Sequence, residues 1–306
     1  MKISIIYLLF ILSFLTACSD EKVIESFFVN GNLRGNVFSC RWNSFEAIDK
    51  FGEISKAKFI DDYTNFYNEN GEQIGQKGYD SENKLTSKRT FKYIYNENEI
   101  EKNSYNIDGL LSWKNKSISD NNGNKIEDSF YQEDGSLSSK QTYKYDKSGN
   151  EIENNSYGSD GILYNKNIYQ YDNKGNKSNY KSYYSDGSLN NNKTYKYDKN
   201  GNCIEENDYY SDGDFKSKQT YKYDGKGNCI EENYFDSNGS LPEKTTFNYD
   251  NQGNRIMIIS YLQDGNVERS FTWDYKYDNK NNWIKEIYFV NNIPQDITER
   301  EIVYYD

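Results

Sequence analysis

Turn-forming dipeptides recur every 26 residues along most of this chain. Gly-Asn pairs begin at positions 123, 149, 175, 201, 227 and 253, and Asp-Gly or Asn-Gly pairs begin at positions 108, 134, 160, 186, 212, 238 and 264. Two interleaved turn signals per period divide each copy into two segments of about 9 to 11 residues. Side chains in these segments alternate in polarity, whereas a helix would repeat its apolar positions every three to four residues. The sequence therefore predicts two antiparallel strands per copy.

Aligned copies place similar side chains in columns. The second strand of each copy carries lysines on one face, and the first strand carries glutamates, so opposite charges lie on neighbouring strands at about 0.2–1 kcal/mol per pair. The other face of the second strand carries an aromatic column, which consists of Tyr143, Tyr169, Tyr195, Tyr221 and Phe247. We expect this column to stabilise the sheet by packing. Together with Tyr145, it is also the candidate binding surface.

The register of the two strands is open at this stage. Tyr157, Tyr209 and Tyr261 lie five residues after an isoleucine column. A two-residue Asp-Gly turn would place the isoleucines on the face that carries the aromatic column and a column of leucines, which includes Leu137, Leu163 and Leu189. A three-residue turn with a glycine bulge would place these tyrosines there instead.

The N-terminus carries an apolar segment that ends in a cysteine. Lys2 precedes an apolar run over residues 3–15 that is short for a membrane span. Leu15-Thr16-Ala17-Cys18 resembles the lipobox of bacterial lipoproteins. The resemblance implies cleavage before Cys18, acylation of its sulfur and a membrane lipid as the partner of the mature chain. The alternative is an ordinary secretory signal that ends in cysteine by chance.

The motif Tyr143-x-Tyr145-Asp146-x-x-Gly149-Asn150-x-Ile152 resembles the YD repeat of Rhs-type proteins, and Tyr-x-Tyr-Asp recurs in later copies. The resemblance covers residues 61–306 and implies a long sheet that spirals into a shell. About 17 strands at roughly 4.8 Å give about 80 Å of sheet. We therefore expect an open curved ribbon, too short for a closed shell, and we do not carry over toxin delivery.

The predicted fold is all-β: an elongated, twisted antiparallel sheet of 26-residue two-strand repeats, in the form of a β-meander or spiral, with a short N-terminal cap. The expected divisions are a signal peptide at 1–17, an anchor, linker and cap at 18–60, and the repeat array at 61–306 with an atypical last copy. Terminal copies of an array cover its open edges, and Pro294 suits an edge strand.

Composition excludes several function classes. The net charge of −11 argues against a nucleic-acid partner. The chain has no histidine, the commonest general base, and the glutamates recur in every copy instead of forming one catalytic pair. The segment Asp198–Asn202 resembles a calcium loop but lacks the glycine and glutamate positions of an EF-hand. We expect no enzyme activity, no metal and no cofactor.

Cys203 and Cys229 occupy the same column, one copy apart. Two strand spacings amount to about 9.6 Å, which is beyond the reach of a disulfide at about 7 Å. We expect no bridge between them and a free thiol at each.

The expected function is that of a non-enzymatic lipoprotein at the bacterial outer membrane or cell surface, whose repeat sheet is a binding or structural surface for a cell-surface protein or glycan. One alternative is a truncated Rhs-like component of a toxin or immunity system. Another is a secreted carbohydrate-active enzyme, which would need a unique acidic pair in residues 19–60 or 281–306.

Overall fold

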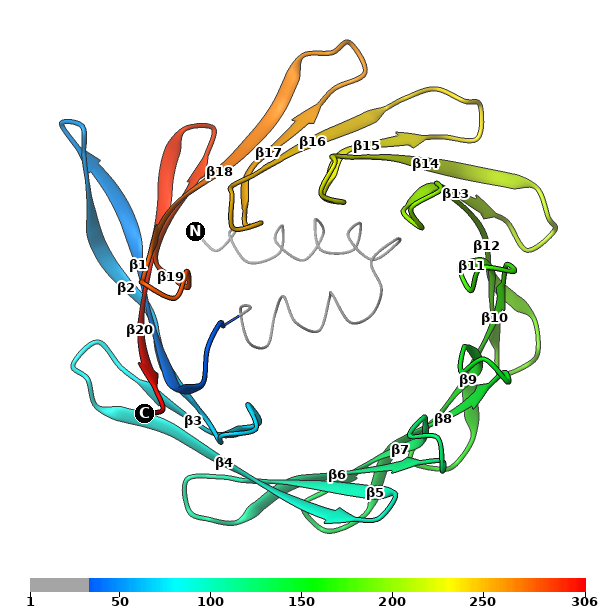
Figure 1. The fold of residues 1–306 in the computed structure, drawn as a ribbon, viewed down its shortest axis with the longest axis horizontal. Helices are drawn as coiled ribbons and strands as arrows, with labels where there is room; N and C mark the ends of the chain where they lie inside the picture. The colour runs from blue at the N-terminus through cyan, green and yellow to red at the C-terminus, as the bar shows by residue number, and fades with distance from the viewer. Residues whose placement is uncertain (1–32) are drawn as a thin grey trace.

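A computed structural model describes residues 33–306 and shows one antiparallel sheet of 20 strands (Figure 1). The all-β antiparallel meander predicted from the repeat is confirmed. The strands are β1 (Val37–Lys50), β2 (Glu53–Tyr67), β3 (Gln73–Tyr79), β4 (Leu85–Asn96), β5 (Glu99–Tyr105), β6 (Leu111–Ser119), β7 (Lys125–Gln132), β8 (Leu137–Tyr145), β9 (Glu151–Tyr157), β10 (Leu163–Tyr171), β11 (Lys177–Tyr184), β12 (Leu189–Tyr197), β13 (Cys203–Tyr209), β14 (Phe215–Tyr223), β15 (Cys229–Phe235), β16 (Glu243–Tyr249), β17 (Arg255–Tyr261), β18 (Val267–Tyr277), β19 (Trp283–Val290) and β20 (Ile293–Tyr304).

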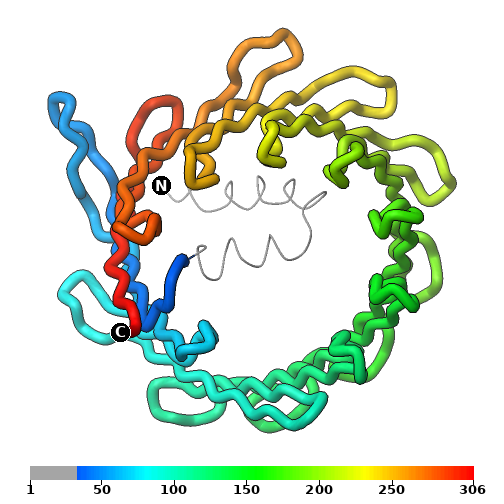
Figure 2. Tube along the Cα trace, in the orientation of Figure 1, coloured from blue at the N-terminus to red at the C-terminus, as the bar shows by residue number. Residues whose placement is uncertain are grey.

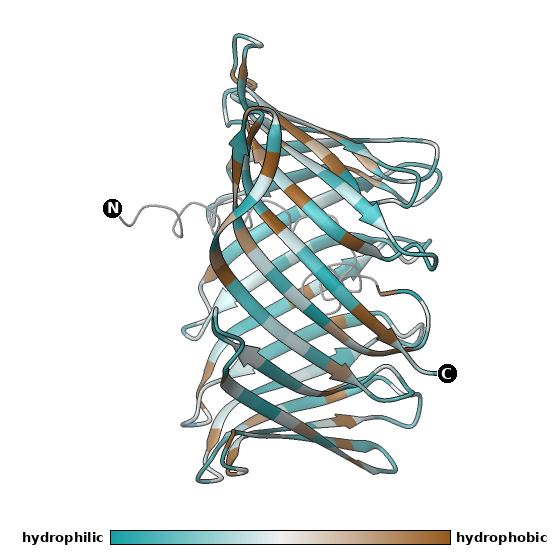
Figure 3. Ribbon diagram, turned by 90° about the vertical axis from the view of Figure 1, so that its left-hand side faces the viewer, coloured by the Kyte–Doolittle hydropathy of each residue, from teal (hydrophilic) through white to brown (hydrophobic). Residues whose placement is uncertain are grey.

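The sheet closes on itself, because β1 pairs with both β2 and β20. The chain trace forms a complete ring (Figure 2), with the strands running obliquely to the ring axis (Figure 3). Twenty strands at about 4.8 Å and a typical tilt of about 40° give a ring roughly 40 Å across at the backbone.

The expectation of an open ribbon with capped edges is therefore wrong. Residues 37–50, placed in the N-terminal cap, form a ring strand, and Pro294 lies in β20, which has a partner on each side. The physical reason is that two unpaired edges at the ends of one curved sheet satisfy each other's backbone groups when they meet.

Both kinds of turn are three-residue turns that end in a left-handed glycine. In the turn between β8 and β9, the N–H of Gly149 donates to the carbonyl of Asp146 at 3.1 Å, and the N–H of Asp146 donates to the carbonyl of Asn150 at 2.9 Å. Gly149 has φ 85°, a conformation that costs glycine little. The turn between β9 and β10 repeats this pattern with Gly161.

These turns settle the open register in favour of the glycine bulge. Tyr157 lies opposite Leu163 across the bulge, while the preceding Ser156 lies opposite Asn165. On its other side Tyr157 lies opposite Lys140, and it shares the face of Lys144 and Glu153. The turn length of the second alternative is therefore confirmed, but its placement of Tyr157 on the face of the aromatic column is wrong.

The sheet has two polar faces. On the face that we call the charged face, Lys144 and Lys166 both pair with Glu153, at 2.7 and 3.1 Å. On the opposite face, which we call the aromatic face because it carries the aromatic column, Lys193 pairs with the buried Glu206 at 2.5 Å. Figure 3 shows hydrophilic residues along the whole length of the strands.

In residues 33–306, no helix is long and apolar enough to cross a membrane.

The second tyrosine of the Tyr-x-Tyr-Asp motif forms a hydrogen bond to the backbone of the preceding strand, and we call this contact a tyrosine staple. Its hydroxyl donates to the carbonyl of the residue 20 positions earlier, at the start of the preceding strand. The pairs are Tyr145 with Lys125 at 2.7 Å, Tyr171 with Glu151 at 2.7 Å, Tyr223 with Cys203 at 2.7 Å and Tyr249 with Cys229 at 2.9 Å. The motif is thus explained by the fold.

The cysteine prediction is confirmed in part. Cys229 is a free thiol, so no bridge joins it to Cys203. Cys203 is not among the free thiols of residues 33–306, so the prediction of a free thiol at this position is not confirmed. The strand-spacing argument concerned only this one pair of cysteines.

Candidate functional site

The aromatic column lies on one face, as predicted, but its members are not direct neighbours. Each ring lies opposite a residue of the intervening first strand: Asn154, Tyr180, Glu206, Glu232 and Ile258 in order along the column. Tyr169 and Tyr180 stack at 5.5 Å. Tyr221 and Phe247 are buried, at 7% and 3% exposure. These two rings contribute to packing, and whether the column also binds a ligand remains a prediction.

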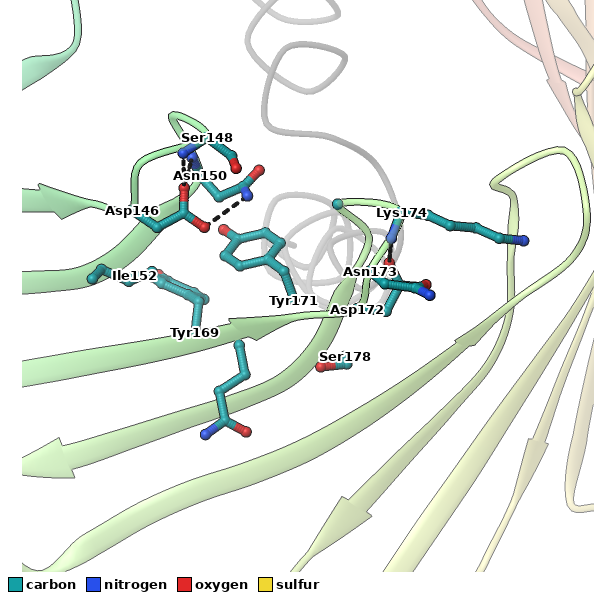
Figure 4. A pocket seen from close by; sticks show the side chains of 12 residues that line it. Asp146, Ser148, Asn150, Ile152, Tyr169, Tyr171, Asp172, Asn173, Lys174 and Ser178 are labelled. Carbon is teal, nitrogen blue, oxygen red and sulfur yellow. Dashed lines mark hydrogen bonds between the residues drawn. The ribbon is translucent and has the colours of Figure 1, made fainter.

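Open grooves lie between successive Gly-Asn turns (Figure 4). One, of about 880 Å³, is lined by Asp146, Ile152, Tyr169 and Tyr171, among others. A second lies four copies along, with Asp250 and Ile256 at the equivalent positions. The grooves follow from the repeat and do not single out one copy.

The carboxylates of the turn aspartates accept hydrogen bonds from groups within their own turns. Asp146 accepts hydrogen bonds from the N–H groups of Ser148 and Asn150 at 2.8 and 3.0 Å, and from the Asn150 side chain at 2.9 Å (Figure 4). These bonds, led by that of the Asn150 side chain, lower the pKa of Asp146. Asp198 is engaged in the same way. Among residues 33–306, no three potential ligands of the His, Cys, Asp or Glu type gather into a metal site.

A different kind of pocket lies where the ring closes. This closure pocket, of about 710 Å³, lies among β1, β2, β17, β18, β19 and β20. Its aromatic walls are Trp42, Trp273, Tyr275, Trp283 and Tyr288. Three of the chain's 4 tryptophans are therefore in one place. Trp42, Trp273 and Trp283 all fall where the sequence departs from the repeat, and that departure is the signal that could have revealed the pocket.

Arg300 supports the wall of the closure pocket. Its guanidinium lies 3.6 Å from the ring centroid of Trp283 and 4.9 Å from that of Trp42, and its Nε donates to the carbonyl of Trp283 at 2.7 Å. Arg300 is only 5% exposed, and burial lowers its pKa. The cation is therefore held within the protein by rings and a carbonyl.

The closure pocket is also lined by three carboxyl groups that the repeat does not supply: the exposed Asp61, and the partly buried Glu286 and Asp296. Burial raises the pKa of Glu286, and the nearby Asp296 adds to this effect, while a hydrogen bond with Tyr275 and the charge of Arg300 oppose it. Burial also raises the pKa of Asp296, with a further contribution from Glu46. Within residues 33–306, neither Glu286 nor Asp296 forms an ion pair with a lysine or arginine.

Glu286 and Asp296 form the unique acidic pair that a carbohydrate-active enzyme would need in residues 281–306. A general acid and its partner base, however, have pKa values that their surroundings move apart. Here both values move upward. The directions of these shifts thus do not divide the pair into an acid and a base.

The chain segment that precedes β1 forms one edge of the closure pocket. The N–H of Arg34 donates to Oδ1 of Asn282 at 2.6 Å, and Nδ2 of Asn282 donates to the carbonyl of Arg34 at 2.8 Å. Asn282 is 2% exposed. The side chain of Arg34 also donates to the carbonyl of Gln252 at 3.1 Å. These bonds tie the start of the ring to two turns near its end.

No protein-family model matches this sequence, and no curated protein does. Among solved structures, the chain is similar to a porin-like protein from Bacteroides uniformis, with 12% identity and a TM-score of 0.37, over 87% of this chain and 98% of that one. A porin-like protein from Bacteroides vulgatus matches with 12% identity and a TM-score of 0.29, over 89% and 99%. The Photorhabdus luminescens Tc holotoxin pore matches with 13% identity and a TM-score of 0.30, over 77% of this chain and 16% of that one. These scores are low, and we draw no function from them.

Proposed function

We propose that this protein is a membrane-anchored, non-enzymatic binding lipoprotein that takes a saccharide into the closure pocket. The observation that carries the proposal is the gathering of five aromatic side chains around one pocket together with Glu286 and Asp296. Aromatic rings supply flat apolar faces for sugar rings, and tyrosine and tryptophan also supply a polar end. Largely apolar pockets with a few convergent polar groups are the usual sites of small ligands.

The anchor in this proposal is Cys18, which lies outside the described residues. Its support is the lipobox resemblance and the presence of ion pairs on both faces of the sheet. A sheet of this kind attaches to a membrane more readily through acyl chains than by insertion. The proposed location is outside the cytoplasm, at the outer membrane or cell surface.

Saccharide binding is tested on the protein purified in mild detergent, with a panel of oligosaccharides and tryptophan fluorescence as the readout. We expect a bound sugar to change the emission, and Trp273→Ala to weaken the affinity by about tenfold or more. Trp113→Ala is the matched control, since Trp113 lies in β6, away from the pocket. Equal weakening by both variants, or no binding by the parent protein, would refute the site.

The same panel distinguishes binding from catalysis. Release of reducing sugar that is abolished by both Glu286→Gln and Asp296→Asn would replace the binding proposal with a carbohydrate-active enzyme. Unchanged oligosaccharide after prolonged incubation supports a non-enzymatic role.

The anchor has its own test. We expect intact-mass analysis to show a chain that begins at Cys18 and carries acyl groups, and Cys18→Ser to move the protein from the membrane fraction to the soluble fraction. A membrane-bound Cys18→Ser variant would contradict the anchor and leave the closure pocket unaffected.

A further inference from the structure

We infer that the closure pocket selects a saccharide that carries a protonated amine, and that the ammonium group lies between Glu286 and Asp296. This inference rests on the proposed function and names the ligand class of the same site.

Strand pairing brings the two carboxyls to one place. In the β19–β20 pair, Glu286 lies opposite Thr298, and Tyr288 lies opposite Asp296. Glu286 and Asp296 are therefore diagonal neighbours on one face, and such diagonal positions are roughly 7–8 Å apart. An ammonium group placed between them would be within hydrogen-bond or ion-pair range of both carboxylates.

The arginines around the pocket already have partners. Arg300 is held against Trp283, Arg255 lies 4.6 Å from the ring centroid of Phe247, and Arg34 donates to the carbonyl of Gln252. The pocket is thus lined by the partly buried Glu286 and Asp296 and by the exposed Asp61, and within residues 33–306 none of the three forms an ion pair with a lysine or arginine. A positive charge on the ligand favours the ionised forms of Glu286 and Asp296, which burial disfavours.

The aromatic walls fit the same ligand group. Tyr288 stacks on Trp273 with their ring centroids 5.3 Å apart. The ring centroids of Tyr275 and Trp283 are 6.0 Å apart. Rings with carboxylates beside them attract ammonium groups through the ring quadrupole as well as through charge. A neutral sugar would gain only the stacking, so the pocket should discriminate in favour of the amine.

The experiment compares two pairs of probes by titration calorimetry at neutral pH. One pair is a glucosamine oligomer and the N-acetylglucosamine oligomer of the same length. The other is choline and its neutral analogue 3,3-dimethylbutanol. We expect the charged member of each pair to bind more tightly by about tenfold or more.

The variants are Glu286→Gln, Asp296→Asn and the double variant, with Glu268→Gln as the control because Glu268 is exposed on β18. We expect the double variant to abolish the preference for charge while keeping the melting temperature within a few degrees of the parent, and the control to keep the preference. Equal affinity for the two oligomers would overturn the inference while leaving the proposed function standing. Binding of neither oligomer would overturn the inference, while the oligosaccharide panel decides the proposed function separately.

Discussion

The guanidinium of Arg300 lies 3.6 Å from the ring centroid of Trp283. Through this contact, and through the second ring of Trp42 at 4.9 Å, one cation of β20 joins the last two strands of the chain to the first. Closure of the ring and formation of the pocket are therefore the same event in structural terms.

Arg300→Ala should destabilise the closed ring. The change removes two cation–π contacts and leaves the carbonyl of Trp283 without its donor, which together amount to about 2–4 kcal/mol. Urea unfolding followed by tryptophan fluorescence measures the loss. The exposed Arg89 is the control, and Arg89→Ala should change the stability by less than about 0.5 kcal/mol. Equal effects of the two changes would contradict the role of Arg300.

Pairing of the first and last strands can be trapped directly. Ser44 lies opposite Thr298, and their hydroxyl oxygens are 3.0 Å apart. Ser44→Cys with Thr298→Cys should form a disulfide under mild oxidation, visible as faster migration on a non-reducing gel. Ser44→Cys with Thr272→Cys should not, because Thr272 belongs to β18. An open ribbon would give no cross-link in either variant.

The tyrosine staples should each contribute one hydrogen bond. Tyr223→Phe keeps the ring and removes the donor to the carbonyl of Cys203, so we expect a loss of about 0.5–1.5 kcal/mol. The measurement is the free energy of unfolding in urea. Tyr164→Phe, at an exposed tyrosine, should leave the free energy of unfolding unchanged. An unchanged free energy of unfolding for Tyr223→Phe as well would show that the tyrosine staple does not stabilise the sheet.

The aromatic column should stabilise the sheet according to burial. Tyr221→Ala removes a ring that is 7% exposed and should cost on the order of 3–5 kcal/mol. Tyr210→Ala, at 50% exposure, should cost much less. Thermal melts of alanine variants at 143, 169, 195 and 221 test the column as a whole. Unchanged melting temperatures together with lost ligand binding would make the column a recognition surface instead.

The contributions of Glu231 and Glu232 to the free energy of unfolding should change with pH in opposite directions. Burial raises the pKa of Glu232 to about 7 against the opposing charge of Arg255. The folded state therefore holds this proton more tightly than the unfolded state, and stability falls as pH rises from about 4.5 to about 7. Glu232→Gln should remove that fall, which is worth up to about 3 kcal/mol.

Glu231 faces the other side of the sheet, where hydrogen bonds from Asn233, Lys222 and Lys244 lower its pKa to about 2. Its contribution is present above about pH 4.5 and is lost as pH falls towards 2. Unfolding free energies of Glu231→Gln and Glu232→Gln between pH 3 and 8 measure both effects. Parallel pH profiles for the two variants would contradict the assignment of the faces.

Local chemistry explains why so much of the fold could be predicted. A two-strand copy is defined by residues within one period: the glycines that accept left-handed turns, the aspartates that accept the turn N–H groups and the alternation of side chains between two faces. Turn length was the one local feature that stayed open, because Asp-Gly fits both a two-residue and a three-residue turn. The bulge at Tyr157 was decided by pairing with Leu163.

Closure and the pocket depend on contacts that no periodic signal encodes. Trp42 and Arg300 are far apart in the sequence, and each belongs to a strand that departs from the repeat. Their meeting depends on curvature summed over 20 strands, and a small change in twist per strand would separate the two edges. The sequence by itself determined the strands, the positions of their turns and the charged face, because those follow from neighbours along the chain. Only the tertiary structure decided that the sheet closes and that Glu286, Asp296 and the three tryptophans share one pocket, because that outcome depends on the geometry of the whole ring.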